Sequence, residues 1–137
     1  MPTAKFPGHF KSLAGIRKFV YDAASAAGFS DKEIYAVELA VDEACSNIIE
    51  HAYGGEGKGE ITCTCNNLNN GLEIILKDYG DAFDPSIVAT PDFSVEMGQL
   101  KPRGAGLFLI RNMMDDVDFK FSKKNGNQLR MVKLRND

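Results

Sequence analysis

Apolar residues recur at helical spacing in the first half of the chain. Between Phe10 and Ala27 they fall three or four positions apart, and Gly28 follows where a helix would end. Ser30 and Glu33 have the spacing of a capping box, which marks the start of a helix. Beyond it, apolar residues line one helix face: Ile34, Val37, Val41, Ala44, Ile48 and Ala52. The pattern predicts two helices, the second of them long.

Alternation of apolar and polar residues, followed by turn signals, predicts strands after the second helix. One strand covers residues 61–66 and its antiparallel partner covers residues 72–77, with the turn-forming sequence NLNNG between them. Helical spacing returns over residues 107–114, and two more strands flank the turn at Asn125 and Gly126. We expect an α/β fold, a two-layer sandwich in which a mostly antiparallel mixed sheet carries the helices on one face.

The segment from Tyr79 to Arg103 has a different character. It is rich in Gly, Pro, Asp and Ser, shows little periodicity, and is longer than an ordinary connection. Such a segment is either functional or disordered, and we interpret it as a lid over a site.

Composition narrows the classes of function. With 137 residues and 15.0 kDa, the chain is expected to form a single domain over residues 1–137. A net charge of −3 disfavours general binding to nucleic acid, and the excess of basic residues from Lys101 onward is interpreted as a solvated face rather than a partner site. No apolar run is long enough for a membrane span, and the N-terminus lacks a signal-peptide core, so a cytoplasmic protein is expected.

The cysteines give no sign of a disulfide framework or of zinc. Cys45, Cys63 and Cys65 are odd in number and lack a C-x-x-C pair. We expect them to be small buried hydrophobes in a reducing compartment.

Glu43 and Asn47 form the first candidate for chemistry. They lie four positions apart on the second predicted helix, on a flank more than about 100° from the centre of the apolar stripe, and His51 continues the row. A carboxylate can accept a proton, and an amide oxygen can coordinate Mg²⁺. Taken alone, the pair is more typical of a solvated helix face, and His51 could as easily cap the end of the helix.

The sequence LKDYGDAFDP is the second candidate. Asp78 ends an apolar strand and can accept a hydrogen bond from an exocyclic amino group, while Gly80 lets a flat ring approach the backbone. This geometry suits adenine. The same residues are also common in an ordinary turn.

The third candidate is KPRGAGLFLIRNMMDD, in which glycines precede an apolar helix. Backbone N–H groups at a helix N-terminus bind phosphate, Gly104 and Gly106 permit close approach, and Arg103 can add a charge-assisted contact. Turns before helices also need glycine, so this signal is weak by itself. The glycine run over residues 54–59 lacks a G-K-[ST] ending and is interpreted as a helix cap and turn.

The order of the three segments resembles a known family. ELAVDEACSNIIEHAYG resembles the N box, DYGDAFDP the first glycine box and RGAGLFLIRNMMDDV the second glycine box of GHKL, or Bergerat-fold (HATPase_c), ATP-binding domains. Within that superfamily, the chain is most similar to stand-alone anti-sigma factor serine/threonine kinases of the RsbW type. The resemblance extends over about residues 13–134.

The resemblance implies a role for each matching residue. Asn47 would contact Mg²⁺, Glu43 would be the general base toward the attacking hydroxyl, and Asp78 would hold the adenine amino group with Gly80 beside it. The implied cofactors are therefore ATP and Mg²⁺.

The second glycine box would surround the phosphates. Gly104 and Gly106, with Ala105 between them, would cradle the phosphates under the lid; Arg103 would lie nearby, and Leu107 would open the helix behind them. Where the family often has Gly-Thr before the last strand, this chain has Gly126, Asn127 and Gln128. We expect the Asn127 side chain to reach a ring nitrogen of adenine.

Such relatives transfer the γ-phosphoryl group of ATP to a Ser or Thr of an anti-anti-sigma (STAS-domain) protein. They also sequester a sigma factor, often as homodimers, and neither a nucleic acid nor a membrane is an expected direct partner. Two alternatives stay open: an ATP-responsive binding module without kinase turnover, and a detached ATPase domain of a histidine kinase. Against the second, no helical hairpin with a phosphoacceptor histidine precedes the domain.

Overall fold

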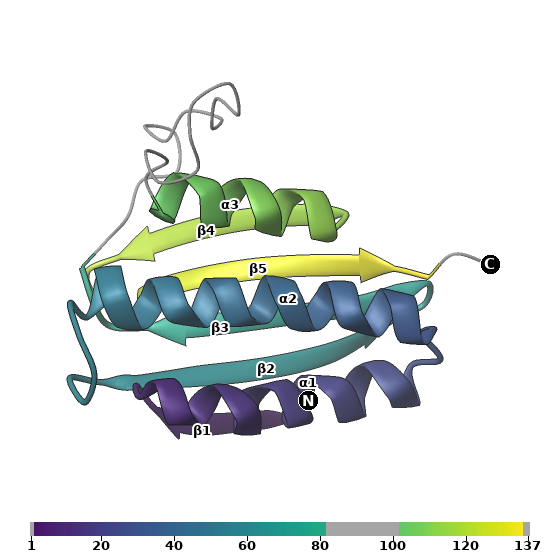
Figure 1. Cartoon of the computed structure of the whole chain (residues 1–137), viewed down its shortest axis with the longest axis horizontal. Coiled ribbons are helices and arrows are strands. Elements are labelled where there is room, and N and C mark those ends of the chain that lie inside the picture. Colours follow the sequence, from purple (N-terminus) through teal and green to yellow (C-terminus); the bar gives the residue numbers. More distant parts are fainter. Residues whose placement is uncertain (1, 82–101, 136–137) are drawn as a thin grey trace.

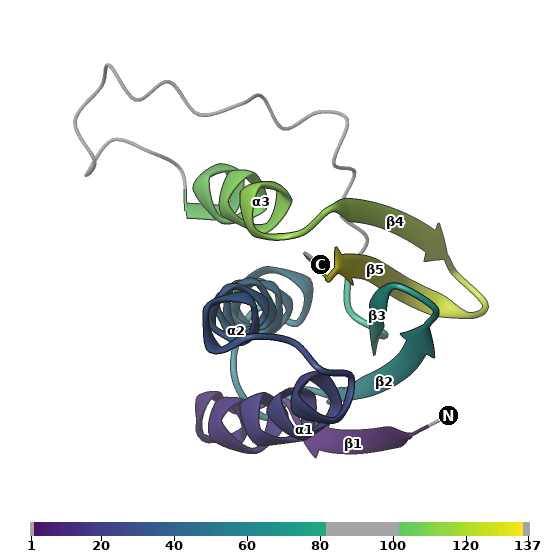
Figure 2. The same ribbon diagram turned by 90° about the vertical axis from the view of Figure 1, so that its right-hand side faces the viewer.

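The computed structural model describes residues 2–81 and 102–135. A five-stranded sheet forms one layer and the helices form the other, on a single face of the sheet (Figures 1 and 2). The strands are β1 (Thr3–Pro7), β2 (Glu60–Leu68), β3 (Gly71–Asp78), β4 (Asp116–Ser122) and β5 (Gly126–Leu134). The α-helices are α1 (Leu13–Ala26), α2 (Asp31–Asn47) and α3 (Pro102–Met113). The two-layer sandwich predicted from the sequence is confirmed.

The sheet has the strand order β1-β2-β3-β5-β4. All four pairings between these strands are antiparallel, so the described part of the sheet contains no parallel pair and the expectation of a mixed sheet was wrong there. Asp78, the last residue of β3, lies opposite Asn127 near the start of β5. This register brings together two of the predicted site residues, which are far apart in the sequence.

The two predicted N-terminal helices are confirmed, together with the end of the first and the start of the second. Gly28 follows α1 with φ +86°, a conformation that glycine adopts without strain. The Ser30 hydroxyl accepts a hydrogen bond from the Glu33 backbone N–H (3.2 Å), and the Glu33 carboxylate accepts one from the Ser30 N–H (2.8 Å). The capping box therefore satisfies two backbone donors that would otherwise be unpaired at the start of α2.

The apolar stripes of the helices meet the inner face of the sheet in one core. The largest fully buried side chains come from both layers: Ile16, Val20, Val37, Val41, Ile49, Ile61, Leu72, Ile74, Leu76, Ile110 and Met131. Each such side chain stabilises the fold by about 1.5–3 kcal/mol relative to leaving it exposed. Cys45, Cys63 and Cys65 are buried and free, as predicted, and burial raises the pKa of Cys45 far above that of an ordinary thiol.

Three local features differ from the sequence prediction. β1 was not predicted, and it pairs along the edge of β2. The apolar stripe predicted one helix through Ala52, but α2 ends at Asn47 and continues as η2 (Ile48–Ala52), a π-helix in which the Tyr53 N–H donates to the Ile48 carbonyl (2.9 Å). A spacing of four residues places Ile48 and Ala52 on one side of either kind of helix, so the pattern could not separate them.

The third difference is the start of α3. The sequence predicted a helix opening at Leu107 behind the glycines, whereas α3 begins at Pro102, so Gly104 and Gly106 lie within its first turns. Proline is favoured at the first helical position, and an internal glycine costs only about 1 kcal/mol. Most of the predicted lid, residues 82–101, lies outside the described residues. In the described part, no helix is long and apolar enough to cross a membrane.

Candidate functional site

A pocket of about 540 Å³, open mouth included, lies between the C-terminal part of α2 and the sheet. The lining is mostly apolar with a few polar groups: Ala44, Asn47, Ile48, Ala52, Asp78, Asp81, Ile110, Phe119, Phe121, Asn127, Gln128 and Leu129. Such a lining is typical of a ligand site in which polar groups fix the orientation of a largely apolar molecule.

Asp78 is the buried acid of this pocket. Its side chain is 5% exposed, and its Oδ1 accepts hydrogen bonds from the Gly80 N–H (2.9 Å) and from Asn127 Nδ2 (2.9 Å). Burial raises the pKa of Asp78, and the two hydrogen bonds only partly offset that rise. Among the described residues, no hydrogen bond reaches Oδ2. The carboxylate therefore keeps one oxygen for a donor that enters the pocket, such as an exocyclic amino group.

The Asn127 side chain holds the loop after β3 in place. Its Nδ2 lies 2.9 Å from Asp78 Oδ1, 3.0 Å from the Gly80 carbonyl and 3.3 Å from the Asp81 carbonyl. Because all three neighbours are acceptors, the amide nitrogen must point toward them. The NH₂ group of Asn127 is thus engaged within the protein, and a contact of this side chain with adenine stays a prediction.

Glycine is needed at two points of the same loop because backbone approaches backbone there. A Cβ on Gly80 would lie 2.4 Å from the Ala52 carbonyl oxygen, and the neighbouring Asp81 N–H donates to that oxygen (2.7 Å). Gly126 has φ +82°, and a Cβ there would lie 2.6 Å from the Asp78 carbonyl oxygen. Gly80 itself is not among the described residues that line the pocket, so its close approach is to η2.

Asn47 and Glu43 follow each other along α2, one turn apart. Both are half-buried, and Asn47 lines the pocket whereas Glu43 is not among the described lining residues. Burial raises the pKa of Glu43, and the nearby carboxylates of Glu50 and Asp42 raise it further. A carboxyl group with a raised pKa is better matched to accepting a proton near neutral pH than an ordinary glutamate.

His51, which continues the same row, lies in η2. Its Nε2 is 3.8 Å from the Glu50 carboxylate, and it is not among the described residues that line the pocket. The structure therefore gives His51 a place beside the site rather than in it.

The second glycine box is described only through its backbone. Arg103, Gly104, Ala105, Gly106 and Leu107 all lie in the first turns of α3. Ile110, one turn farther along, lines the pocket and so places α3 beside it. The backbone N–H groups of the first turn have no acceptors within the helix, which suits an anion.

Two aromatic residues of the pocket were missed as site residues in the sequence. Phe119 and Phe121 stack on each other, with ring centroids 6.1 Å apart and planes 11° apart, and both line the pocket. Strand alternation places them on one face, and Phe121 pairs with Asn127 across the sheet. That register was the signal that could have found them, but it depends on the exact pairing of β4 with β5.

The side chains present fit a magnesium ion only if a ligand supplies most of its oxygens. Within residues 2–81 and 102–135, no group of three or more His, Cys, Asp or Glu side chains could hold a metal ion. Asn47 lines the pocket, and its side chain carries one amide oxygen. Magnesium commonly binds to one or two protein groups together with phosphates and water, so this donor set fits a metal that arrives with a nucleotide.

Comparison with known proteins shows which family the chain belongs to. The family described as histidine kinase-like ATPase domain matches residues 6–133. The chain belongs to this family. It is 33% identical over 138 residues to the serine-protein kinase RsbW of Bacillus velezensis, covering 96% of this chain and 84% of that protein. It is 37% identical over 117 residues to the protein of the same name from Bacillus cereus, covering 82% of this chain and 72% of that protein.

Two solved structures share the fold. One is the crystal structure of the RsbU and RsbW domains of a Mycobacterium tuberculosis protein (TM-score 0.67, 13% identity), covering 98% of this chain and 32% of that chain. Another is the catalytic domain of the histidine kinase ThkA (TM-score 0.57, 12% identity), covering 98% of each chain. The Bergerat-type fold predicted from the three boxes is confirmed.

Proposed function

We propose that this chain is an ATP-binding anti-sigma factor with serine/threonine protein kinase activity. The observation that carries the proposal is the placement of Asn47, Asp78 and Phe121 around one pocket. The identity to proteins named serine-protein kinase RsbW over most of the chain supports the same class of enzyme.

The nucleotide base would lie against the Asp78 end of the pocket. The exocyclic amino group of adenine would donate to Asp78 Oδ2, and Phe119, Phe121 and Ile48 would contact the ring. Asn127 would act indirectly, by fixing the Asp78 carboxylate through its hydrogen bond to Oδ1. The phosphates would then extend toward the start of α3, where Arg103 brings a positive charge and Gly104 a backbone N–H without an acceptor in the helix, while Ala105 and Gly106 keep the next turn free of large side chains.

Asn47 would hold Mg²⁺ through its amide oxygen. When bound, Mg²⁺ neutralises charge on the phosphate oxygens, which is the largest demand of phosphoryl transfer. Glu43, one helical turn away, would orient the acceptor hydroxyl and take its proton. Its raised pKa follows from burial and from neighbouring carboxylates.

The acceptor in this proposal is a Ser or Thr of an anti-anti-sigma STAS-domain protein. A sigma factor is the second partner, and a homodimer is the proposed assembly. A cytoplasmic location stays a prediction.

Incubation with γ-labelled ATP, Mg²⁺ and the STAS protein encoded nearest to this chain tests the proposal. We expect label on a Ser or Thr of the STAS protein, and loss of that label in Glu43→Gln with ADP affinity retained. Full labelling by Glu43→Gln would remove Glu43 from the proposed role.

The two alternatives give other results in the same assay. Tight ATP binding without any labelled protein would indicate a binding module, and label on a histidine would indicate a histidine-kinase ATPase domain. Asn47→Ala gives a second test: it should weaken nucleotide binding in Mg²⁺, and an unchanged calorimetric titration would contradict the assigned contact.

A further inference from the structure

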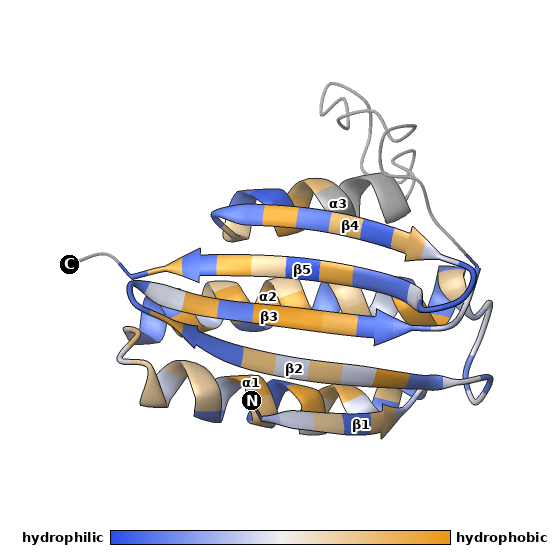
Figure 3. Ribbon diagram, turned by 180° about the vertical axis from the view of Figure 1, so that it is seen from behind, coloured by the Kyte–Doolittle hydropathy of each residue, from blue (hydrophilic) through white to orange (hydrophobic). Residues whose placement is uncertain are grey.

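One face of the sheet carries no helix, and a row of lysines crosses it. Figure 2 shows the helices on the opposite face, and Figure 3 looks directly onto the uncovered one. The strand registers align one residue from each strand in the order Lys5, Thr62, Lys77, Gln128 and Lys120. Their strand neighbours Ile61, Leu76 and Leu129 are buried toward the helices, so this row faces outward. We call Lys5, Lys77 and Lys120 the lysine row.

The lysine row has no counterion of its own in the described part of the chain. None of its three ammonium groups forms an ion pair there, and the Lys77 ammonium lies 5.2 Å from the centre of the Tyr79 ring. Its two intervening residues, Thr62 and Gln128, are neutral. Further lysines, at positions 58, 123 and 124, belong to the loops at the same end of the sheet.

A surface hollow lies at one end of the row. Lys5, Lys58 and Lys77 line it together with the exposed ring of Tyr79, and Glu60 is the one carboxylate among its described lining residues. Three positive groups therefore surround a depression that contains a single negative group. An exposed aromatic ring beside them offers apolar contact as well as charge.

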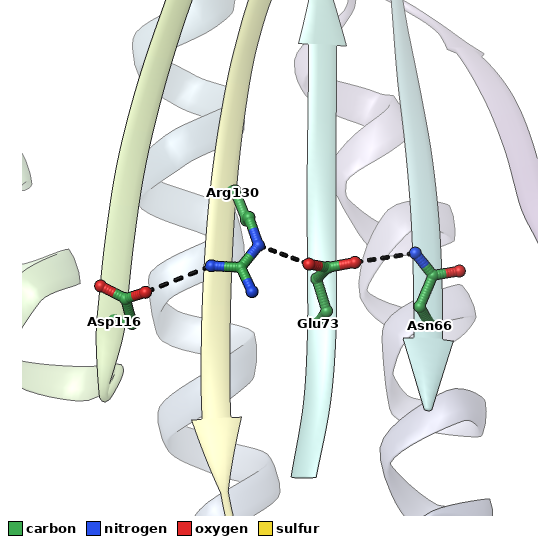
Figure 4. A network of polar contacts seen from close by, with 4 residues as sticks. All are labelled: Asn66, Glu73, Asp116 and Arg130. Carbon is green, nitrogen blue, oxygen red and sulfur yellow. Dashed lines mark hydrogen bonds and ion pairs between the residues drawn. The ribbon is translucent and has the colours of Figure 1, made fainter. Parts of the chain in front are cut away.

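Other charged residues on the same face of the sheet are paired with one another within the protein. Arg130 bonds to Glu73 and to Asp116 (3.2 Å), and Asn66 donates to Glu73 (2.9 Å), so that a continuous network crosses four strands (Figure 4). Glu73 and Asp116 are thereby compensated within the protein. Lys77 and Lys120 lie on the same strands as Glu73 and Asp116, but the lysine row forms no such ion pairs within the described residues.

We propose that the lysine row and its hollow form a docking surface for an acidic segment of a protein partner. Neighbouring strands are about 4.8 Å apart, so lysines on alternate strands are about 9.6 Å apart and the row is about 19 Å long. An extended segment advances about 3.3 Å per residue, so carboxylates about three positions apart would match the row. The surface is on the opposite face of β3 from the Asp78 pocket and does not depend on the proposed nucleotide site.

The distribution of charge favours an acidic protein over a nucleic acid. Asp116, Asp118 and Glu73 lie on the same face beyond the row, and the whole chain has a net charge of −3. A nucleic acid would have to extend its phosphates over these carboxylates, whereas a short acidic segment can remain on the row.

Fluorescence anisotropy with a labelled oligoglutamate peptide tests the proposal, with oligoglutamine of equal length as the neutral probe. The test variant is Lys5→Gln/Lys77→Gln/Lys120→Gln, and the control variant Lys18→Gln/Lys32→Gln/Arg111→Gln removes the same charge from the helices. We expect the test variant to bind oligoglutamate about tenfold more weakly and the control variant to stay within about twofold of wild type. Arginine at the three row positions should restore binding, because charge is what the row supplies.

Salt gives an independent check. Binding should weaken between about 10 mM salt, where the Debye length is about 30 Å, and about 100 mM, where it is about 10 Å. Absence of oligoglutamate binding, or an equal loss in the control variant, would overturn the proposal. Tighter binding of a single-stranded oligonucleotide through the same three lysines would overturn the assignment to a protein partner.

Discussion

Replacing Asn127 by alanine removes the amide that joins Asp78 to the loop after β3. Its Nδ2 donates within 2.9 Å of Asp78 Oδ1 and 3.0 Å of the Gly80 carbonyl, and the side chain is only 8% exposed. A hydrogen bond to a charged group contributes about 1.5–3 kcal/mol and a bond between neutral groups about 0.5–1.5 kcal/mol. Water can enter the space left by the side chain and replace part of the lost hydrogen bonding. We therefore expect the free energy of unfolding to fall by about 2–3 kcal/mol at neutral pH.

The loss should depend on pH through Asp78. The pKa of Asp78 is raised by burial, so its ionised form costs stability, and removal of the Asn127 donor raises that pKa further. Asn127→Ala should therefore cost most above the folded pKa of Asp78. The cost should shrink as the pH falls and Asp78 becomes protonated, because the lost hydrogen bond is then one between neutral groups.

Urea unfolding of wild type and variants at neutral pH and at an acidic pH below the folded pKa of Asp78 measures both effects. Asn127→Thr keeps one hydrogen-bond donor, so its free energy of unfolding should fall less than that of Asn127→Ala. Gln128→Ala, at the next position of the same strand, is the matched control and should cost about 0.5 kcal/mol or less. A loss below about 0.5 kcal/mol for Asn127→Ala, or the same loss at both pH values, would refute the reasoning.

Three further predictions follow from single contacts. Glu50→Gln should lower the pKa of Glu43 and move the acid limb of the kinase pH profile to lower pH, and an unmoved limb would contradict this coupling. Gly80→Ala places a Cβ 2.4 Å from a backbone oxygen of η2, so it should cost about 1–3 kcal/mol in unfolding and weaken ADP binding; wild-type values for both would contradict the packing. The pKa of Glu73 is lowered by the amide and guanidinium groups beside it, so its stabilisation is present above its unfolded pKa and is lost as the pH falls through its folded pKa. Glu73→Gln should accordingly cost about 1 kcal/mol at neutral pH and nothing at a pH below the folded pKa of Glu73, as urea unfolding at these two conditions would show.

The periodic part of the fold could be predicted because burial imposes it on the sequence. The stripe of Ile34, Val37 and Val41 and the alternation around Cys63 reflect a single core between two layers. The edge strand β1 could not be found in this way, because its pattern is only five residues long and none of its side chains is fully buried.

The sequence predicted which residues belong to the site, but not their hydrogen-bond partners or packing contacts. Asp78 and Asn47 line the pocket as their positions implied. The clamp between Asn127 and Asp78 depends on the register of β3 with β5, and the engagement of Gly80 with Ala52 depends on the π-helical end of the second helix. Residue spacing alone determines neither the strand register nor the type of helix.

Equilibrium dialysis of the purified chain with ATP and ADP in Mg²⁺ tests the central claim most directly, with Asp78→Asn as the paired variant. The account predicts that wild type binds both nucleotides and that Asp78→Asn, which exchanges the acceptor carboxylate for an amide of similar size, binds both much more weakly. Failure of wild type to retain either nucleotide, or equal binding by the variant, would contradict a nucleotide held by Asp78 between the second helix and the sheet.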